Sequence, residues 1–119
     1  MDIQEMIRKA RENPDAEKIG MIASHLGIVR GTSRDGRPVT RIEVLYDHEK
    51  LNSIIKNIKL MPGIIEVLVD TREGFLEIGE EILGVVIAGD IRENVFNALI
   101  TAVNRIKAEA SRKKEKMAE

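Results

Sequence analysis

The feature that most constrains the fold is a long amphipathic pattern near the C-terminal end of the sequence. Asp90-Ile91-Arg92-Glu93 has the form of a capping box, in which the Asp90 side chain caps a helix and the Glu93 side chain bonds back to the N–H of the cap residue. Apolar residues then recur at helical spacing, which predicts a helix from about Ile91 to at least Ala110. Its expected buried arc contains seven apolar residues: Val95, Phe96, Leu99, Ile100, Val103, Ile106 and Ala110.

The rest of the chain predicts two further helices and several short strands. Residues 2–12 have helical periodicity, and a second helix starts after Asp47 as its N-cap and ends at Pro62-Gly63. Four strands are expected, at Gly20–Arg30, Val39–Tyr46, Ile64–Asp70 and Ile82–Ala88. The last of these is apolar on both faces and is therefore expected at the centre of its sheet. We expect the first two to form a hairpin around Asp35-Gly36.

These elements predict one α+β domain over residues 1–119, with a mixed or antiparallel sheet, flanking helices and a flexible tail at residues 111–119. The sequence has no cysteine, so disulfides, thiolate metal sites and cysteine nucleophiles are excluded. The only histidines are His25 and His48, and no metal site is expected. Because His25 lies within an apolar strand, we expect it to be a satisfied core or interface residue rather than a base.

The charge balance gives no global reason to expect a nucleic-acid or membrane partner. Lys and Arg number 19 against 20 Asp and Glu, which leaves a net charge of -1. No apolar run reaches the roughly 20 residues of a membrane span. The first residues lack the basic and apolar regions of a signal peptide, and we expect a cytoplasmic protein.

Three basic residues fall on the apolar arc of the long helix: Arg92, Lys107 and Lys114. One interpretation is that their stems cover apolar surface while the charges reach water. The other is that Lys107 lies on the floor of a pocket, where partial desolvation would lower its pKa and suit it to acid–base chemistry or anion binding. Lys107 and Lys114 would be roughly 10 Å apart along the helix, and Arg92 about 22 Å from Lys107. A site that uses all three would therefore need two subunits.

Two other basic segments have alternative interpretations. Arg34, Arg37 and Arg41 flank a glycine-containing loop, which is either a solvated hairpin tip or a loop that grips phosphate. The run from Arg112 to Lys116 is either a solvated helix end or a nucleic-acid-binding tail, and its lack of aromatic residues favours the former.

Three stretches, in order and with matching spacing, resemble the large catalytic subunit of molybdopterin synthase. The first is the strand that ends in Gly27-Ile28-Val29-Arg30, followed by a glycine-containing loop. The second is Arg72-Glu73-Gly74-Phe75-Leu76-Glu77-Ile78-Gly79-Glu80, and the third is Arg92-Glu93-Asn94-Val95-Phe96-Asn97-Ala98. The spacing from Arg92 to Lys107 and Lys114 matches that family's arginine and two lysines without a gap. The resemblance covers about residues 20–115.

The resemblance implies a hammerhead-like fold, a homodimer with composite sites, and sulfur transfer without a bound cofactor. A ubiquitin-like small subunit with a C-terminal thiocarboxylate would donate sulfur to a cyclic pyranopterin monophosphate, which becomes the molybdopterin dithiolene. In this interpretation Lys107 and Lys114 are catalytic, and Arg30 and Arg92 bind the substrate. Lys113 is a further substrate-binding residue, and it would replace Lys114 if the alignment slips by one residue.

The sequence departs from the family pattern at several positions. Ile91 and Thr71 stand where the family has histidines, and Ser111-Arg112-Lys113 replaces a Pro-aromatic-Trp segment. The sequence stops at Glu119, so we expect a divergent, C-terminally truncated member. The alternative function is a catalytically impaired dimeric module that still binds a pterin or the partner. A third is a structural or regulatory dimer with no pterin ligand.

Overall fold

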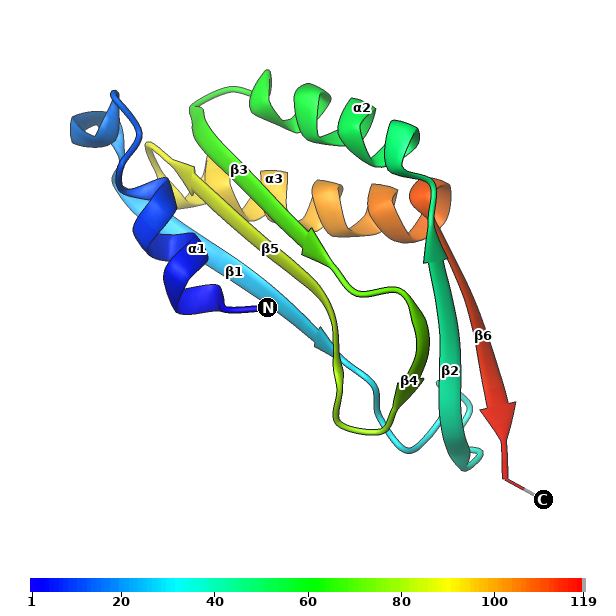
Figure 1. Ribbon diagram of the computed structural model, residues 1–119. Coiled ribbons are helices and arrows are strands. Elements are labelled where there is room, and N and C mark those ends of the chain that lie inside the picture. The colour runs from blue at the N-terminus through cyan, green and yellow to red at the C-terminus, as the bar shows by residue number, and fades with distance from the viewer. Residues whose placement is uncertain (119) are drawn as a thin grey trace.

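The computed structural model describes residues 1–118 as an elongated α+β structure of 53 × 25 × 22 Å. Two three-stranded antiparallel sheets have the strand orders β1-β5-β3 and β4-β2-β6 (Figure 1). No helix among these residues is long and apolar enough to cross a membrane. The elements are α1 (Ile3–Ala10), the 3₁₀ turn η1 (Ala16–Lys18), β1 (Met21–Ile28), β2 (Val39–Tyr46), α2 (His48–Lys59), β3 (Ile64–Thr71), β4 (Gly74–Glu77), β5 (Glu81–Gly89), α3 (Arg92–Arg105), the π turn η2 (Ile106–Ala110) and β6 (Ser111–Met117).

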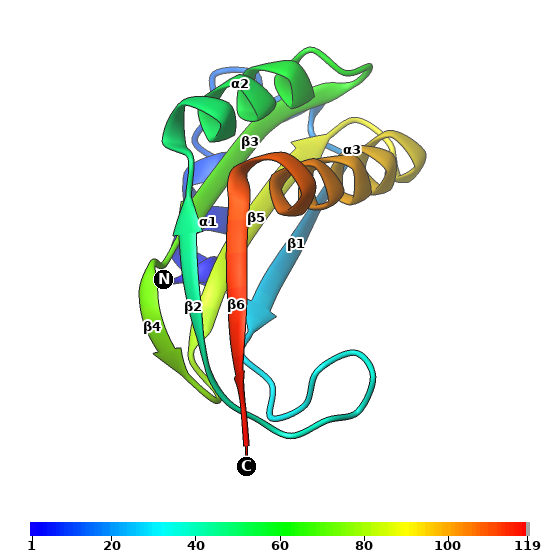
Figure 2. The same ribbon diagram turned by 90° about the vertical axis from the view of Figure 1, so that its right-hand side faces the viewer.

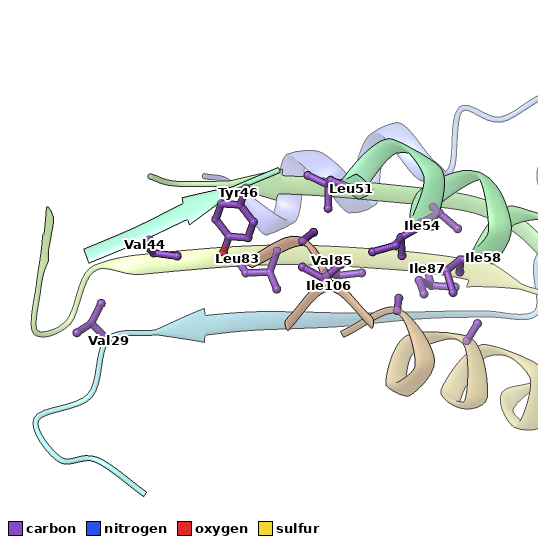
Figure 3. Close-up of a cluster of buried hydrophobic side chains, with 14 of the residues drawn as sticks. Val29, Val44, Tyr46, Leu51, Ile54, Ile58, Leu83, Val85, Ile87 and Ile106 are labelled. Carbon is purple, nitrogen blue, oxygen red and sulfur yellow. The ribbon is translucent and has the colours of Figure 1, made fainter. Parts of the chain in front are cut away.

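The central strand β5 is buried on both faces, as the sequence predicted, and it separates two apolar clusters. Val86 and Ala88 pack with Met6 and Ala10 of α1 on one face of the sheet. On the other face, Val85 and Ile87 belong to the main core, which α2 and α3 cover (Figure 3). Successive residues of a strand point to opposite faces, so a strand with a helix layer on each side must be apolar throughout. The α+β fold class predicted from the sequence is confirmed.

The predicted start of α2 is confirmed, whereas that of α3 is displaced by one residue. Asp47 is the N-cap of α2, and its carboxylate accepts a hydrogen bond from the Lys50 N–H at 3.1 Å. The N-cap of α3 is Ile91, which provides no side-chain cap. Asp90 instead accepts hydrogen bonds from the Ile91 N–H and from the Asn94 amide, at 2.7 and 2.9 Å. The capping box expected at Asp90 and Glu93 is therefore wrong.

The expected hairpin between the first two strands is also wrong, because β1 and β2 belong to different sheets. β1 pairs with β5, and β2 pairs with β4 and β6. The loop between them is closed only by an isolated bridge from Thr32 to Pro38. Strands that are neighbours in sequence need not pair, and β1 instead pairs along its whole length with the apolar strand β5.

The C-terminal segment differs most from its prediction. The regular α-helix ends at Arg105, a π turn follows to Ala110, and Ser111–Met117 forms β6. β6 runs antiparallel to β2 and supplies hydrogen bonds to an edge that would otherwise be open (Figure 2). The Asp47 N–H also donates to the Ala110 carbonyl at 2.8 Å, which fixes the point where the helix ends. The flexible tail expected from residue 111 is therefore wrong through Met117, and Glu119 lies outside the described residues.

The buried face of α3 is narrower than the arc expected from the sequence. Val95, Ile106 and Ala110 are buried as predicted, with Ala98 and Ala102 beside them. Phe96 and Ile100, which were expected in the core, are 49% and 61% exposed. The small alanines allow α3 to pack closely against the sheet, so the contact face is centred on them and not on the larger side chains two positions away.

Candidate functional site

A cavity of about 660 Å³ lies between the two sheets, beside the end of β1 and the π turn. Its apolar walls come from β2 and β5, and its polar groups come from β1, the loop that follows β1, η2 and β6. The polar lining residues are His25, Arg30, Arg34, Tyr46, Lys107, Ser111, Lys113 and Glu115. This volume is in the range of small-molecule sites.

Four of these residues are cations that converge from segments far apart in the sequence: Arg30, Arg34, Lys107 and Lys113. Within residues 1–118, none of the four has a carboxylate oxygen within 4.0 Å. Burial lowers the pKa of Lys107, and the positive charges of Lys113, Arg34 and Arg30 lower it further. A cluster of uncompensated cations favours an anionic ligand, and a lysine with a lowered pKa can release its proton more easily.

The register of β6 separates the two adjacent lysines. Lys113 pairs with Val44, a core residue of β2, and faces the cavity together with Glu115. Lys114 pairs with Glu43 and faces the opposite side of the sheet. There it lines a shallow groove beside Phe75, whose ring the Arg41 guanidinium covers at 5.0 Å. The sequence placed Lys114 on the helical arc of Lys107, but a strand alternates its side chains, so Lys113 and not Lys114 lies with Lys107.

Arg92 does not join this cavity in the same chain. It is the first residue of α3, its side chain is 77% exposed, and its nearest charged partner is Glu93 at 3.4 Å. Lys107 lies beyond the other end of the same helix. Of the five site residues predicted from the sequence, the cavity therefore contains Arg30, Lys107 and Lys113, and Arg92 and Lys114 lie outside it.

Tyr46 closes the apolar wall of the cavity without acting as a base. Its hydroxyl donates to the Ile82 carbonyl at 3.4 Å, and its backbone N–H donates to the Glu73 carboxylate at 2.9 Å. Burial raises the pKa of Tyr46 to about 12, and the negative charge of Glu73 acts in the same direction. The phenol therefore stays protonated at neutral pH, and its ring serves as an apolar surface (Figure 3).

The loop after β1 is folded in a way that directs Arg34 towards the cavity. Ser33 is buried, and its hydroxyl bonds to the Asp35 carboxylate. Asp35 also holds the Arg37 guanidinium at 2.8 Å, and the Ser33 N–H donates to the Arg37 carbonyl at 2.8 Å. This arrangement leaves Arg34 free to line the cavity together with Arg30 at the start of the loop. The two interpretations of this loop were a solvated hairpin tip and a phosphate-binding loop, and the location of Arg34 agrees with the second.

His25 is the cavity residue for which sequence reasoning proposed only a structural role. Its position in an apolar strand gave no sign of a site, because the cavity exists only where β1 passes β6 and η2. The signal that could have indicated it is Gly27, two residues later on the same face of the strand, whose missing side chain allows the imidazole to pack over the strand backbone.

Comparisons with known proteins agree with this architecture. The family model of the MoaE protein matches residues 1–109, which include Lys107 and end before β6. A probable molybdopterin synthase from Haloferax volcanii is 28% identical over 112 residues, covering 90% of this chain and 43% of that protein. The chain thus spans less than half the length of that relative.

Two solved structures show the same fold at low sequence identity. The molybdopterin synthase from Staphylococcus aureus superposes with a TM-score of 0.76 at 23% identity, covering 95% of this chain and 85% of that one. A complex of subunits 1 and 2 of the molybdopterin-converting factor from Helicobacter pylori matches with a TM-score of 0.70 at 18% identity, covering 100% of this chain and 85% of that one. With the family model matching residues 1–109, the resemblance inferred from the three sequence stretches is confirmed, and the chain belongs to the MoaE protein family.

Proposed function

We propose that this chain transfers sulfur in molybdenum cofactor biosynthesis, as the large subunit of a molybdopterin synthase. A small ubiquitin-like partner would bring a C-terminal thiocarboxylate, and a cyclic pyranopterin monophosphate would receive the sulfur as a dithiolene. The observation that carries the proposal is the cavity in which four unpaired cations surround an apolar wall. The cations suit the phosphate and the thiocarboxylate, and the wall suits the flat ring system. The cytoplasmic location predicted from the sequence is part of the same proposal.

We assign the chemistry to Lys107, with Lys113 in place of Lys114. Lys107 has a lowered pKa, so it can act as an acid that protonates the substrate ring as it opens. Lys113, Arg30 and Arg34 hold the anionic groups in position. Each transfer leaves the partner with an ordinary terminal carboxylate, whose new oxygen comes from water, while the sulfur becomes bonded to the pterin.

The test is a sulfur-transfer assay with purified protein, a thiocarboxylated small subunit and the pterin precursor. Lys107→Ala should lower the rate by about 10²–10⁴-fold, the usual contribution of a positioned acid or base. Lys113→Ala should also lose most activity, whereas Lys114→Ala, on the opposite face of β6, should keep it. A larger loss in Lys114→Ala than in Lys113→Ala would contradict the assignment. Wild-type protein that binds the precursor but transfers no sulfur would favour the impaired binding module.

We further propose that the protein is a homodimer and that Arg92 serves the cavity of the partner subunit. Arg92, Phe96 and Ile100 are spaced four residues apart, so they form one stripe along the exposed face of α3. An apolar stripe of this kind is typical of an interface with another protein surface. A two-fold dimer would place the same stripe against itself and would carry each Arg92 away from its own subunit.

A further inference from the structure

His25 is placed on the inner face of β1, at the cavity wall nearest the π turn. It pairs with Val85 of β5, and residues directly opposite in an antiparallel pair share one face of the sheet. Val85 belongs to the core below α2 and α3, so His25 lies on that same face. A Cβ atom added to Gly27 would lie only 3.3 Å from the His25 Nε2, so the imidazole packs over the backbone of Gly27, where a side chain would crowd it.

The His25 imidazole has no hydrogen-bond partner within residues 1–118. Its Nε2 is buried and unpaired, and it is the only such side-chain atom among the described residues. A buried polar atom without a partner is unfavourable, because it gives up its hydrogen bonds to water and gains none in return, so its presence needs an explanation. His48, the other histidine, differs in this respect, because its Nε2 lies 2.8 Å from a Glu73 carboxylate oxygen on the exposed surface.

The surroundings of His25 favour a neutral ring. Burial lowers the pKa of His25, and the positive charge of Lys107 lowers it further. Charged and titratable groups from four other segments line the same cavity. They are Arg30 and Arg34 of the loop after β1, Tyr46 of β2, Lys107 of η2, and Lys113 and Glu115 of β6. Four of these six are cations that only donate hydrogen bonds. A neutral imidazole adds an acceptor that carries no charge.

We propose that His25 is a ligand-binding residue, whose neutral imidazole turns into the cavity and accepts a hydrogen bond from a ring N–H of the bound heterocycle. Lys113, Arg30 and Arg34 hold the phosphate of the same ligand, and His25 recognises the ring. The inference rests on the proposed function, because that function supplies a pterin monophosphate as the ligand class. It explains why an imidazole without a protein partner lies in the wall of a cavity that four cations line.

The binding test compares two probes, a stable pterin monophosphate and inorganic phosphate, by isothermal titration calorimetry. His25→Phe should weaken binding of the pterin monophosphate by about tenfold, the value of one hydrogen bond, and leave phosphate affinity within about twofold. His25→Gln keeps an amide acceptor and should recover most of the affinity. His48→Gln is the matched control and should bind both probes as the wild type does. Wild-type affinity for the pterin should fall as the pH drops and His25 becomes protonated, whereas that of His25→Gln should not.

Long-range ¹H–¹⁵N spectra of the wild type give a readout that needs no His25 variant. With only two histidines, His48→Gln assigns both imidazoles, and the His25 nitrogens should shift when the pterin monophosphate binds. Unchanged His25 resonances in the bound state would overturn the inference, as would equal losses for both probes in His25→Phe without recovery in His25→Gln. Pterin binding that ignores His25 would leave the proposed function standing. His25-dependent binding without any sulfur transfer would support the role of His25 and contradict the proposed function.

Discussion

At the scale of single residues, the cavity combines groups whose charged forms are disfavoured. Lys107 lies among other cations, and the His25 imidazole lies beside Lys107, so both groups hold protons less firmly than they would in the unfolded chain. This arrangement lowers stability in the absence of an anion and is the usual condition of a site that waits for a charged ligand. Binding of an anion would relieve the repulsion and stabilise the folded state.

The pH dependence of stability should report the environment of His25. The folded state holds its pKa below the ordinary value of 6.5, so the unfolded state binds the proton first as the pH falls. The contribution of His25 to stability is therefore present above pH 6.5 and is lost as the pH falls through the lowered pKa. We expect the melting temperature to drop more between pH 7.5 and 5.0 for the wild type than for His25→Gln. Differential scanning calorimetry tests this, and equal drops in the two proteins would contradict it.

At the scale of elements, three chain segments cross at the end of the first sheet, where glycines permit the contact. Gly63 precedes β3, Gly89 ends β5, and the Asp90 N–H donates to the Gly63 carbonyl at 2.9 Å. Gly20 precedes β1, and its N–H donates to the Gly89 carbonyl at 2.8 Å. A side chain on Gly20 would overlap the Asp90 carbonyl. The close approach of the segments before β1 and after β5 therefore requires glycine at position 20.

Two glycine substitutions separate backbone strain from crowding at this crossing. Gly63 and Gly36 both have positive φ, of 74° and 87°, so alanine is strained at either position. A Cβ on Gly63 would also overlap the Asp90 carboxylate, whereas a Cβ on Gly36 would meet nothing within 4 Å. Gly63→Ala should therefore destabilise the protein by about 1–3 kcal/mol more than Gly36→Ala. Urea denaturation of both variants measures this, and equal losses would show that crowding at Asp90 is unimportant.

At the scale of the whole molecule, the exposed stripe of α3 is the feature that a monomer does not explain. If it forms the dimer interface, Phe96→Glu should place two like charges at the two-fold contact and yield monomers. Leu60→Glu is the matched control, because Leu60 is also an exposed apolar residue, at 84%, but lies at the end of α2. Light scattering after gel filtration should show a dimeric wild type and a dimeric Leu60→Glu. A monomeric wild type would contradict the homodimer and the role of Arg92 across it.

Local patterns were enough to predict most elements, but not how the elements pair. The spacing of Leu51, Ile54 and Ile58 predicted α2, and the continuous apolar run of β5 predicted its central position, since each pattern reflects burial on a known face. The pairing of β2 with β6 joins segments about seventy residues apart, and no local signal records such a contact. The charged sequence of β6 has the composition of a solvated tail, because its stability comes from the backbone ladder and not from its side chains.

The candidate site could be predicted only in part for the same reason. Arg30 was identified through the family resemblance and Lys107 first through its place on the helical arc, and the structure brings both to the cavity. The choice between Lys113 and Lys114 depends on whether the segment is a helix or a strand, and helical extrapolation through Ala110 selected Lys114. Arg34 and His25 join the site through a loop fold and a contact between sheets, which the spacing of residues along the chain does not encode.

The pairing of β2 with β6 also bears on how the protein is made. On the ribosome, β2 emerges about seventy residues before β6, so one of its edges stays open while the residues between them are made. An open edge is a template for pairing with other chains, and nascent molecules on neighbouring ribosomes would be the nearest candidates. Two of the four cations of the cavity, Lys107 and Lys113, lie in η2 and β6 and are made together with this strand. The cavity and the protection of the sheet edge are thus completed at the same stage of synthesis.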